Sequence, residues 1–375
     1  MENDSVLVTG GAGFIGSHLV DRLIGEGRTV VVLDSLEPQV HRGSPGFRNA
    51  GARYIEGSIH DRDALGVALD GVGAVVHLAA QVGVGQSMYE MSRYVGDNTL
   101  GTVSLLEELA KRTKQVRALV VASSMSIYGE GQYRCDACDN DDAEVIRHLE
   151  SLRARDWEPV CRRCSGAVRP SATRESKRLS CESVYAITKR DQEELALVFG
   201  RAYGIRAVAL RFFNVFGPRQ SLSNPYTGVA AIFSSRLLNG HAPEVFEDGL
   251  QTRDFIHVSD IARAIQLALS QDDVGDVALN VGTGVATSVL TVAQVLGEEL
   301  GVDIEPKIVN RFRQGDVRHC FADGTRARDE LGFQAAVGFR EGMGELVGWI
   351  REGTPEAVDL TERATDELAK RGLVL

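Results

Sequence analysis

A short apolar run, a glycine-rich turn and an amphipathic helix pattern follow one another near the start of the chain. The run Val6–Thr9 predicts a buried strand, and the turn GGAGFIG over residues 10–16 opens a helix that extends through Leu23. Glycines at this spacing make a tight turn, let the backbone approach a pyrophosphate and allow close packing of helix on strand, with the helix N-terminus facing the anion. The segment therefore predicts a dinucleotide site. The residues expected there are Gly10, Gly13, Phe14, Ile15 and Gly16.

The second predicted strand, Thr29–Leu33, leads directly into an acidic residue, Asp34. A carboxylate at this place binds the ribose 2′-hydroxyl of NAD and repels the 2′-phosphate of NADP. NAD is therefore the expected cofactor, and Asp34 is expected at its ribose. A purely structural turn with a helix-capping aspartate is the alternative interpretation.

Short β-rich runs continue to alternate with helical patterns along the chain. This alternation predicts an α/β fold with a doubly wound parallel (Rossmann) sheet that gathers strands from distant parts of the sequence. Between Phe212 and Asp254 the composition shifts to Pro, Gly and Asn, with one helix pattern at Val229–Leu238, which predicts a smaller C-terminal α/β substrate domain. The further strands are expected at Ala74–Leu78, Ala118–Ser123, Ala207–Arg211 and Ala278–Val281, and the further helices at Ser183–Tyr203 and Ile261–Leu269.

Composition excludes several classes of protein. With 375 residues, of which 43% are hydrophobic and 25% charged, the chain is an ordinary globular one. The net charge of −11 disfavours nucleic acid as a partner. The N-terminus lacks the pattern of a signal peptide, and no run approaches the ~20 apolar residues of a membrane span. We therefore expect a cytoplasmic protein with no membrane segment, in which thiols or metal ligands are favoured over disulfides for the six cysteines.

Tyr185 and Lys189 lie four residues apart on a predicted helix, so their side chains share one face. A tyrosine with its ordinary pKa of about 10 is no base near neutrality, but a nearby ammonium and a positively charged nicotinamide both favour the phenolate. The pair is therefore typical of proton transfer beside a nicotinamide. Taken alone, this short pattern more often is a tyrosine with an exposed lysine.

Combined with the glycine-rich turn, the pair resembles the extended short-chain dehydrogenase/reductase family, specifically its NAD-dependent nucleotide-sugar epimerases and dehydratases. The resemblance covers nearly the whole chain. Within the family, the chain resembles the branch of dTDP-L-rhamnose 4-epimerase and UDP-glucose 4-epimerase. The motifs, in family order, are Thr9–Gly16, Asp34, His77–Ala80, Asn98, Ser123–Gly129, Tyr185–Lys189, Arg211–Arg219, Ser223–Val229, Phe246–Gly249, Arg253–Asp260, Asn280–Gly284 and 313–318.

The resemblance also implies roles for individual residues. Ser124 would hydrogen-bond the reacting sugar hydroxyl, Tyr185 would be the base, and Lys189 would tune Tyr185 and hold the nicotinamide ribose. Surface ion pairing is the alternative role for the arginines, favoured for Arg219 and Arg318, and ordinary packing is the alternative for Asn224 and Phe246. The further implied NAD contacts are Ser58, Ile59, Leu78, Ala79, Ala80, Asn98, Tyr185 and Lys189. The implied substrate contacts are Ser124, Ser126, Asn214, Asn224, Phe246, Arg253, Arg313 and Asp316.

The residues after Ser123 narrow the implied reaction. Family dehydratases have Thr-Asp-Glu here, and sugar-acid decarboxylases usually have a glutamate where Ser126 stands. Without these carboxyl groups, the resemblance implies a nucleotide-sugar 4-epimerase that works through a transient 4-keto intermediate with tightly bound NAD, on a dTDP- or UDP-(deoxy)sugar. An NAD(P)H-dependent 4-keto-sugar-nucleotide reductase is the alternative within enzymes. A non-enzyme, namely an NAD-sensing or nucleic-acid-binding protein that uses a zinc ribbon, is the alternative outside enzymes. The presence of Ser124, Tyr185 and Lys189 argues against it.

The segment between Tyr128 and Tyr185 is far longer than the family's usual loop and holds two CxxC pairs. Their separation is close to the ~15–20 residues of Cys₄ zinc ribbons, and four thiolates give zinc a closed tetrahedral structural site. Structural zinc is therefore predicted, with a ribbon that has lost its metal or disulfides as alternatives. The insertion is expected to cap the sugar pocket or build a subunit contact. The predicted ligands are Cys135, Cys138, Cys161 and Cys164.

The expected organisation has four parts. Residues 1–134 form the first part of the NAD-binding Rossmann domain, 135–164 the Cys₄ insertion, and 165–211 the continuation of the Rossmann domain with the catalytic helix. Residues 212–375 are mainly the sugar-nucleotide domain, with 255–282 returning to the Rossmann core. A homodimer through Gly96–Lys111 and Val184–Tyr203 is implied by the family's habit of pairing two long helices.

Overall fold

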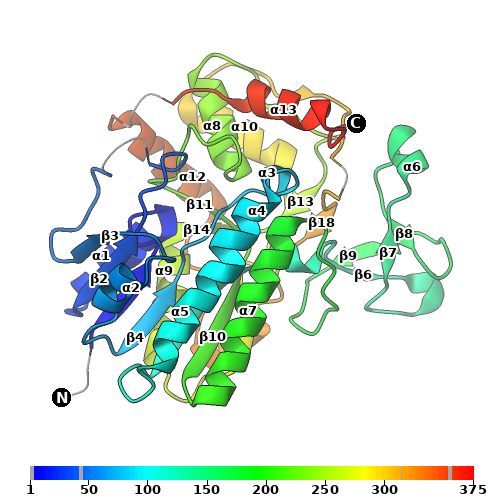
Figure 1. The fold of residues 1–375 in the computed structure, drawn as a ribbon. Helices are drawn as coiled ribbons and strands as arrows, with labels where there is room; N and C mark the ends of the chain where they lie inside the picture. Colours follow the sequence, from blue (N-terminus) through cyan, green and yellow to red (C-terminus); the bar gives the residue numbers. More distant parts are fainter. Residues whose placement is uncertain (1–3, 42–44, 314, 354–356) are drawn as a thin grey trace.

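A seven-stranded parallel sheet forms the centre of this computed structural model, which describes residues 4–41, 45–313, 315–353 and 357–375 (Figure 1). The strand order is β15-β10-β5-β4-β1-β2-β3. It reverses between β1 and β4, and in such sheets ligands bind outside the carboxyl ends of the strands at this switch point. The strands are β1 (Val6–Thr9), β2 (Val30–Asp34), β3 (Arg53–Glu56), β4 (Ala74–His77), β5 (Ala118–Ser124), β10 (Arg206–Phe212) and β15 (Val277–Val281).

The register of the sheet brings the sequence motifs to one edge. Thr9, the last residue of β1, pairs with Leu33 in β2 and with His77 in β4. Farther along the sheet, Ser124 at the end of β5 pairs with Phe212 at the end of β10. The glycine-rich turn, the second-strand aspartate and the serine loop therefore all leave the sheet on the same side.

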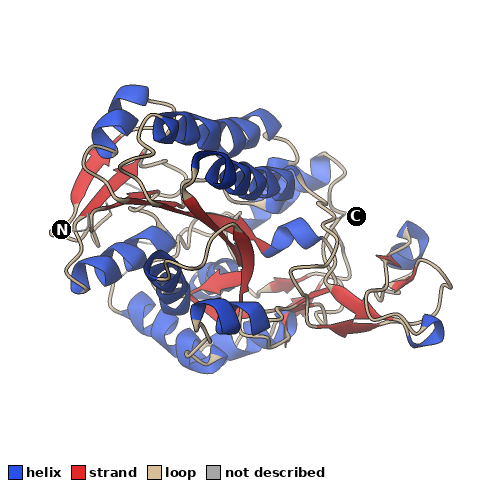
Figure 2. Ribbon diagram, turned by 90° about the horizontal axis from the view of Figure 1, so that it is seen from below, coloured by secondary structure: helices blue, strands red, loops and turns tan. Residues whose placement is uncertain are grey.

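Helices cover both faces of the sheet (Figure 2). On one face α1 (Phe14–Gly25) and α9 (Val258–Ser270) bury apolar residues such as Leu23 and Ile261. On the other face α2 (Arg62–Ala68), α5 (Gly101–Ala110) and α7 (Val184–Tyr203) do the same with Leu65, Leu105 and Phe199. Strands covered on both sides are continuous apolar runs rather than alternating ones. The predicted doubly wound α/β fold is confirmed.

A smaller region with its own apolar cluster lies beside the sheet. Its core packs α8 (Val229–Leu238), α10 (Val289–Leu300) and α12 (Phe339–Arg351) together. The chain returns from it to the central sheet through β14, α9 and β15. The remaining elements of this part are β11 (Asn214–Phe216), β12 (Glu244–Val245), β13 (Thr252–Arg253), β14 (Phe255–His257), β16 (Thr287–Ser288), β17 (Lys307–Ile308), β18 (His319–Cys320), α11 (Thr325–Leu331) and α13 (Thr361–Lys370).

The cysteine-rich segment projects from the body as an arm, drawn in teal at the right of Figure 1. Its base is the antiparallel pair β6 (Gln132–Arg134) and β9 (Arg169–Ser171). A second antiparallel ribbon joins β7 (Val145–Ile146) to β8 (Val160–Cys161), with α6 (Leu149–Arg153) between them. The arm therefore has its own small framework.

Two elements differ from the sequence-based expectation. The edge strand β3 was not predicted, because Arg53 and Glu56 are exposed and leave no continuous apolar run. The helix expected at Gly96–Lys111 begins as a π-helical turn, Val95–Leu100, and continues as α5. Within the described ranges, no helix is both long enough and apolar enough to span a membrane.

Candidate active site

One cavity of about 1120 Å³ runs along the carboxyl edge of the sheet. It extends from the glycine-rich turn to the smaller region, and its middle is at the end of β5 and the start of α7. Nearly all predicted site residues line it, although they come from distant parts of the chain. They are Gly10, Gly13, Phe14, Ile15, Gly16, Asp34, Ser58, Ile59, Leu78, Ala79, Ala80, Ser124, Ser126, Tyr185, Lys189, Asn214, Asn224, Phe246, Arg253, Arg313 and Asp316.

The glycine-rich end of the cavity has room only for backbone. Gly10 has a φ of +71°, and a Cβ there would lie 2.9 Å from the backbone nitrogen of Ala79. A Cβ on Gly16 would collide with the carbonyl oxygen of Gly10. The cradle is thus lined by backbone, and helix α1 begins at Phe14 beside it with N–H groups that have no partner within the helix. This geometry fits a pyrophosphate.

Asp34 is held at the rim of this cradle. Its Oδ2 accepts a hydrogen bond from the N–H of Ala12 at 3.0 Å, and its Oδ1 accepts one from the N–H of Leu36 at 2.9 Å. Each carboxylate oxygen can accept more than one hydrogen bond, so the oriented carboxylate can still receive a ribose hydroxyl.

Ser124, Tyr185 and Lys189 all line the cavity, where β5 ends and α7 begins. Ser124 is the last residue of β5, while Tyr185 and Lys189 lie on the first two turns of α7, whose N-cap Ser183 accepts a hydrogen bond from Ala186. Burial raises the pKa of Tyr185, and its hydrogen bond with Ser124 acts in the opposite direction. The phenol of Tyr185 and the hydroxyl of Ser124 are therefore within reach for proton transfer, and Lys189 lines the same cavity one helical turn after Tyr185.

Lys189 is held by a buried network that sequence reasoning missed. Its Nζ donates a hydrogen bond to Gln192 Oε1 at 2.7 Å, and Gln192 Nε2 lies 3.1 Å from His77 Nε2. His77 Nδ1 lies 2.7 Å from the Thr9 hydroxyl. Burial lowers the pKa of Lys189 to about 7 and, together with the Lys189 charge, that of His77 to about 3. The position of Gln192 three residues after Lys189, on the same helix face, was the available signal.

Asn98, predicted as a cofactor contact, does not line the cavity. Its Oδ1 accepts a hydrogen bond from the N–H of Gln81 at 2.6 Å, and its Nδ2 donates to Gln81 O at 3.1 Å and to Thr188 Oγ1 at 2.9 Å. The protein itself therefore engages both ends of the amide. Asn98 ties the loop after β4 to α7 at Thr188, the neighbour of Lys189.

The far end of the cavity contains buried polar atoms to which a ligand could hydrogen-bond. Asn214 Oδ1 and Arg313 Nε are buried, and among the described residues they have no hydrogen-bond partner. The Arg313 guanidinium lies 4.5 Å from the centroid of the Phe246 ring. Buried polar atoms are normally paired, so these two atoms indicate a binding site for a polar molecule.

Arg253 and Asn224 are held by protein groups at the cavity wall. Arg253 Nη2 pairs with Asp316 Oδ1 at 3.1 Å, and its Nη1 donates to the carbonyl oxygen of Thr252 at 2.9 Å. Asn224 Oδ1 accepts a hydrogen bond from the N–H of Tyr226 at 3.1 Å. Both side chains are thus oriented by the chain itself.

Surface ion pairing was the favoured interpretation for Arg219 and Arg318, and the structure shows it for Arg219 alone of these two. Arg219 pairs with Asp21 at 2.7 Å and is partly exposed. Arg318 is only 1% exposed, so that interpretation was wrong for this residue. Its guanidinium pairs with Glu158 of the arm and with Glu247 and Asp248. The arm is distant from Arg318 in the sequence, so the local sequence around Arg318 does not reveal that the arm buries it.

The arm gathers its four cysteines into one cluster. Their Sγ atoms all lie within 4.8 Å of one another, with 3.6 Å between Cys135 and Cys164 and 3.9 Å between Cys138 and Cys161. Four thiolates around zinc, each with a Zn–S bond of about 2.3 Å, have sulfurs about 3.8 Å apart. Two of the sulfur pairs therefore have the separation found in a tetrahedral zinc site, and none of the four cysteines is in a disulfide.

The doubly wound sheet, the backbone cradle and the Ser–Tyr–Lys group together define an enzyme of the short-chain dehydrogenase/reductase type. Residues 6–157 and 158–282 match the profile of the NAD dependent epimerase/dehydratase family. The dTDP-L-rhamnose 4-epimerase of Burkholderia thailandensis is 32% identical over 360 residues, covering 94% of this chain and 96% of that protein. This chain therefore belongs to the NAD-dependent epimerase/dehydratase family.

Solved structures agree with this assignment. The UDP-glucose 4-epimerase of Thermotoga maritima with UDP-glucose superposes with a TM-score of 0.76 at 32% identity, covering 93% of this chain and 99% of that one. The UDP-glucose 4-epimerase of Thermus thermophilus with NAD gives a TM-score of 0.74 at 28% identity, covering 93% of this chain and 100% of that one. The resemblance found from the sequence motifs is confirmed.

Proposed function

We propose that this protein is a nucleotide-sugar 4-epimerase that keeps NAD bound and acts on a dTDP- or UDP-(deoxy)sugar. The observation that carries this proposal is the position of Ser124 and Tyr185 between the glycine-rich cradle and the polar far end of one cavity. Ser126 occupies the place where an eliminating or decarboxylating relative needs a carboxyl group, and its Oγ donates to Ser124 Oγ at 3.0 Å. The similarity to named 4-epimerases supports the same reaction.

In this proposal each residue has a definite task. Tyr185 removes the proton of the sugar 4-hydroxyl, which Ser124 hydrogen-bonds. Lys189 stabilises the phenolate by its positive charge, since an opposite charge nearby favours the ionised form. The cradle and Asp34 would hold NAD, which would supply the hydride acceptor and donor for C4 of the sugar. The chain supplies orientation and proton transfer.

The far end of the cavity holds the rest of the substrate. Asn214, Arg253 and Arg313 bind the diphosphate. Arg313 suits this task because its planar guanidinium makes paired hydrogen bonds to phosphate oxygens, whereas Arg253, whose Nη atoms donate to protein oxygens, keeps its Nε for the ligand. A firm hold on the diphosphate lets the 4-keto sugar turn over without leaving the site. Phe246 packs against the nucleotide base.

Product analysis tests this proposal. The purified protein, with no added cofactor, is mixed separately with UDP-glucose, UDP-N-acetylglucosamine, UDP-glucuronate, dTDP-glucose and dTDP-L-rhamnose, and products are followed by NMR. We expect the C4 epimer of one or more of these with no net redox change. If none gives an epimer but added NADH is oxidised by a 4-keto sugar nucleotide, the protein is a reductase instead.

We further propose that the cysteine cluster holds one structural zinc ion per chain. The support is the tetrahedral spacing of four sulfurs on two CxxC turns. The N–H of Gly166 also points at Cys164 Sγ, at 3.4 Å, as is common around thiolate ligands. Four protein ligands leave no open position for water, so the site is structural rather than catalytic.

A homodimer through the helices at Val95–Ala110 and α7 is also proposed. Large apolar side chains are exposed along these helices: Val95 (41%), Leu100 (55%), Ile187 (48%) and Val198 (57%). Such a surface is expected to be covered by a partner. Light scattering after size exclusion should give twice the chain mass of 40.6 kDa, and Val198→Glu should reduce it to one chain. A wild-type protein with the mass of one chain would contradict this proposal.

A further inference from the structure

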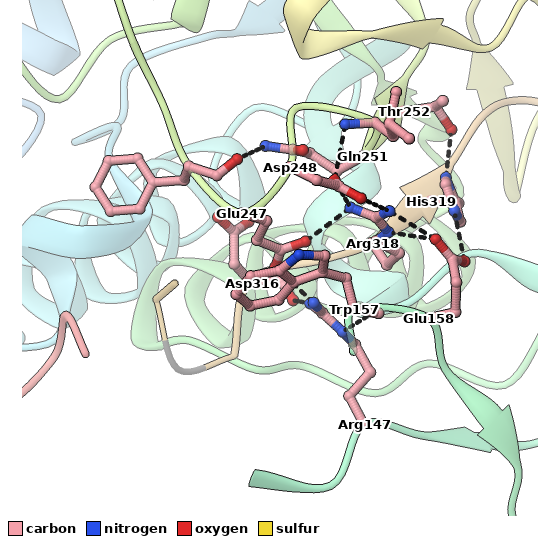
Figure 3. Close-up of polar contacts among 12 residues, drawn as sticks. Arg147, Trp157, Glu158, Glu247, Asp248, Gln251, Thr252, Asp316, Arg318 and His319 are labelled. Carbon is pink, nitrogen blue, oxygen red and sulfur yellow. Dashed lines mark hydrogen bonds and ion pairs between the residues drawn. The ribbon is translucent and has the colours of Figure 1, made fainter. Parts of the chain in front are cut away.

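The arm touches the main body at the nucleotide end of the cavity, through a cluster of charged residues shown in Figure 3. We propose that Arg147 is a positioning residue for substrate binding. It fixes the part of the cavity wall that carries Phe246, Arg253 and Arg313, so that the arm sets the affinity for the nucleotide diphosphate. This inference rests on the proposed function, because it assigns that end of the cavity to the nucleotide.

Arg147 and Glu158 lie at the same end of the cysteine-bearing ribbon. Val145 in β7 pairs with Cys161 in β8, and Ile146 pairs with Val160. Arg147 directly follows β7, and Glu158 lies just before β8. A ribbon held at Cys161 therefore delivers both charged residues together to the body of the protein.

The Arg147 guanidinium joins two separate segments of the cavity wall. Its Nη2 lies 2.5 Å from Glu247 Oε1, and its Nη1 donates to the backbone carbonyl of Asp316 at 3.0 Å. Both side chains of the ion pair are buried, at 8% and 4% exposure. Glu247 directly follows Phe246, and the carboxylate of Asp316 pairs with Arg253. One side chain from the arm therefore orients residues on both sides of the far end.

A second contact from the arm supports the same wall. Glu158 Oε1 lies 2.6 Å from Arg318 Nη2, and the Arg318 backbone oxygen accepts a hydrogen bond from Arg253 at 3.1 Å. A hydrogen bond from His319, with the Arg318 charge, lowers the pKa of Glu158 to about 2, so it stays ionised. The ring of Trp157 packs on Phe312, the neighbour of Arg313, with centroids 6.1 Å apart.

The charges of this cluster depend on Arg147. Arg318 also pairs with Glu247 at 3.0 Å and Asp248 at 2.7 Å, so two guanidinium groups serve the three carboxylates of Glu158, Glu247 and Asp248. Without Arg147, Arg318 would be the one guanidinium of this cluster left for all three, with His319 as a further partner of Glu158 only. Removing one partner of a buried ion pair leaves an uncompensated charge, and the surrounding chain must shift or take up a proton. The segment carrying Phe246 is the part that would shift.

The expected consequence is weaker binding with unchanged chemistry. The contacts of Arg147 are with Glu247, Asp316 and Trp157 at the nucleotide end, whereas the proton transfer occurs at Tyr185. A change that loosens binding of the ground state and the transition state equally raises KM and leaves kcat unchanged.

The test compares Arg147→Met with Arg153→Met, a matched control on the exposed face of α6. Steady-state kcat and KM are measured on the epimerised sugar nucleotide, calorimetry gives Kd for UDP and for dTDP, and metal content is determined for each variant. We expect Arg147→Met to raise KM, and Kd for the preferred nucleotide, about tenfold to a hundredfold, with kcat within about twofold. Arg147→Lys should be intermediate, because a lysine can replace only one of the two contacts with the cavity wall, those with Glu247 and Asp316.

Glu158→Gln is a milder second variant, in case Arg147→Met fails to fold. Its side chain is 57% exposed, and we expect a rise in KM of about threefold with metal content unchanged. Equal KM and Kd in wild type and Arg147→Met would overturn the inference. So would a fall of kcat and metal content together, because that result indicates a general structural role. If the wild type binds neither UDP nor dTDP, the proposed function fails, and the inference fails with it.

Discussion

Replacing Tyr185 with phenylalanine is expected to lower kcat about a thousandfold, because general acid–base catalysis by a positioned side chain contributes roughly 10²–10⁴-fold. The phenol oxygen is the only atom lost. The ring keeps its edge-on packing against Tyr94, with centroids 6.4 Å apart, so the cavity should retain its shape. NAD content of the purified protein and Kd for the nucleotide are therefore expected to remain within about twofold of wild type. Initial rates, cofactor release on denaturation and calorimetry measure these three quantities.

Tyr203→Phe provides the matched control for this variant. Tyr203 is the last residue of the same helix, α7, and is 50% exposed. Its loss should leave kcat within about twofold, since a surface substitution has little effect on a distant site. A Tyr185→Phe enzyme that retains a tenth or more of the wild-type kcat would show that another group moves the proton.

Replacing Cys138 with serine is expected to remove the proposed zinc ion and to weaken substrate binding. Zinc content should fall from one per chain to less than about a tenth, because structural zinc sites depend on all four ligands and their binding energy is folding energy of the local unit. The central sheet should remain folded, since its apolar clusters are separate from the small one around the cysteines. KM for the sugar nucleotide should rise at least as much as in Arg147→Met, because the whole ribbon loses its support.

Metal analysis, limited proteolysis of the arm and steady-state kinetics test this prediction. Cys181→Ser is the control for metal content, since Cys181 lies outside the cluster and contacts Ile127 O through its sulfur at 3.7 Å. The prediction is wrong if purified wild-type protein contains no zinc. It is also wrong if Cys138→Ser retains the metal, or loses it with no change in KM or in protease sensitivity.

The parts of the site that could be predicted are those whose chemistry depends on neighbours in the sequence. The glycine-rich turn, Asp34 at a strand end, the pair Tyr185 and Lys189 one helical turn apart, and two CxxC pairs are all local patterns. A helix or strand period converts such spacing directly into a shared face or edge. For this reason these residues were placed correctly at the cavity or in the cysteine cluster.

The parts that could not be predicted depend on contacts between distant segments. The amide of Asn98 hydrogen-bonds Gln81 and Thr188, so it joins two segments of the cavity wall and does not itself line the cavity. Gln192 acquires its role only because His77 and Lys189 meet on either side of it. Burial and hydrogen bonding at such places come from tertiary packing, which local periodicity does not contain.

The sequence by itself determined the class of fold, the family and the residues that meet at the cavity, and it predicted NAD and the reacting side chains, because these rest on short patterns and on the order of motifs along the chain. Only the tertiary structure decided that Arg318 is buried and that Arg147 reaches the wall of the cavity, where its contacts Glu247 and Asp316 lie 100 and 169 positions farther along the chain. The physical reason is that a charge is stable in the interior only when folding brings partners to it, and those partners lie far apart in the chain.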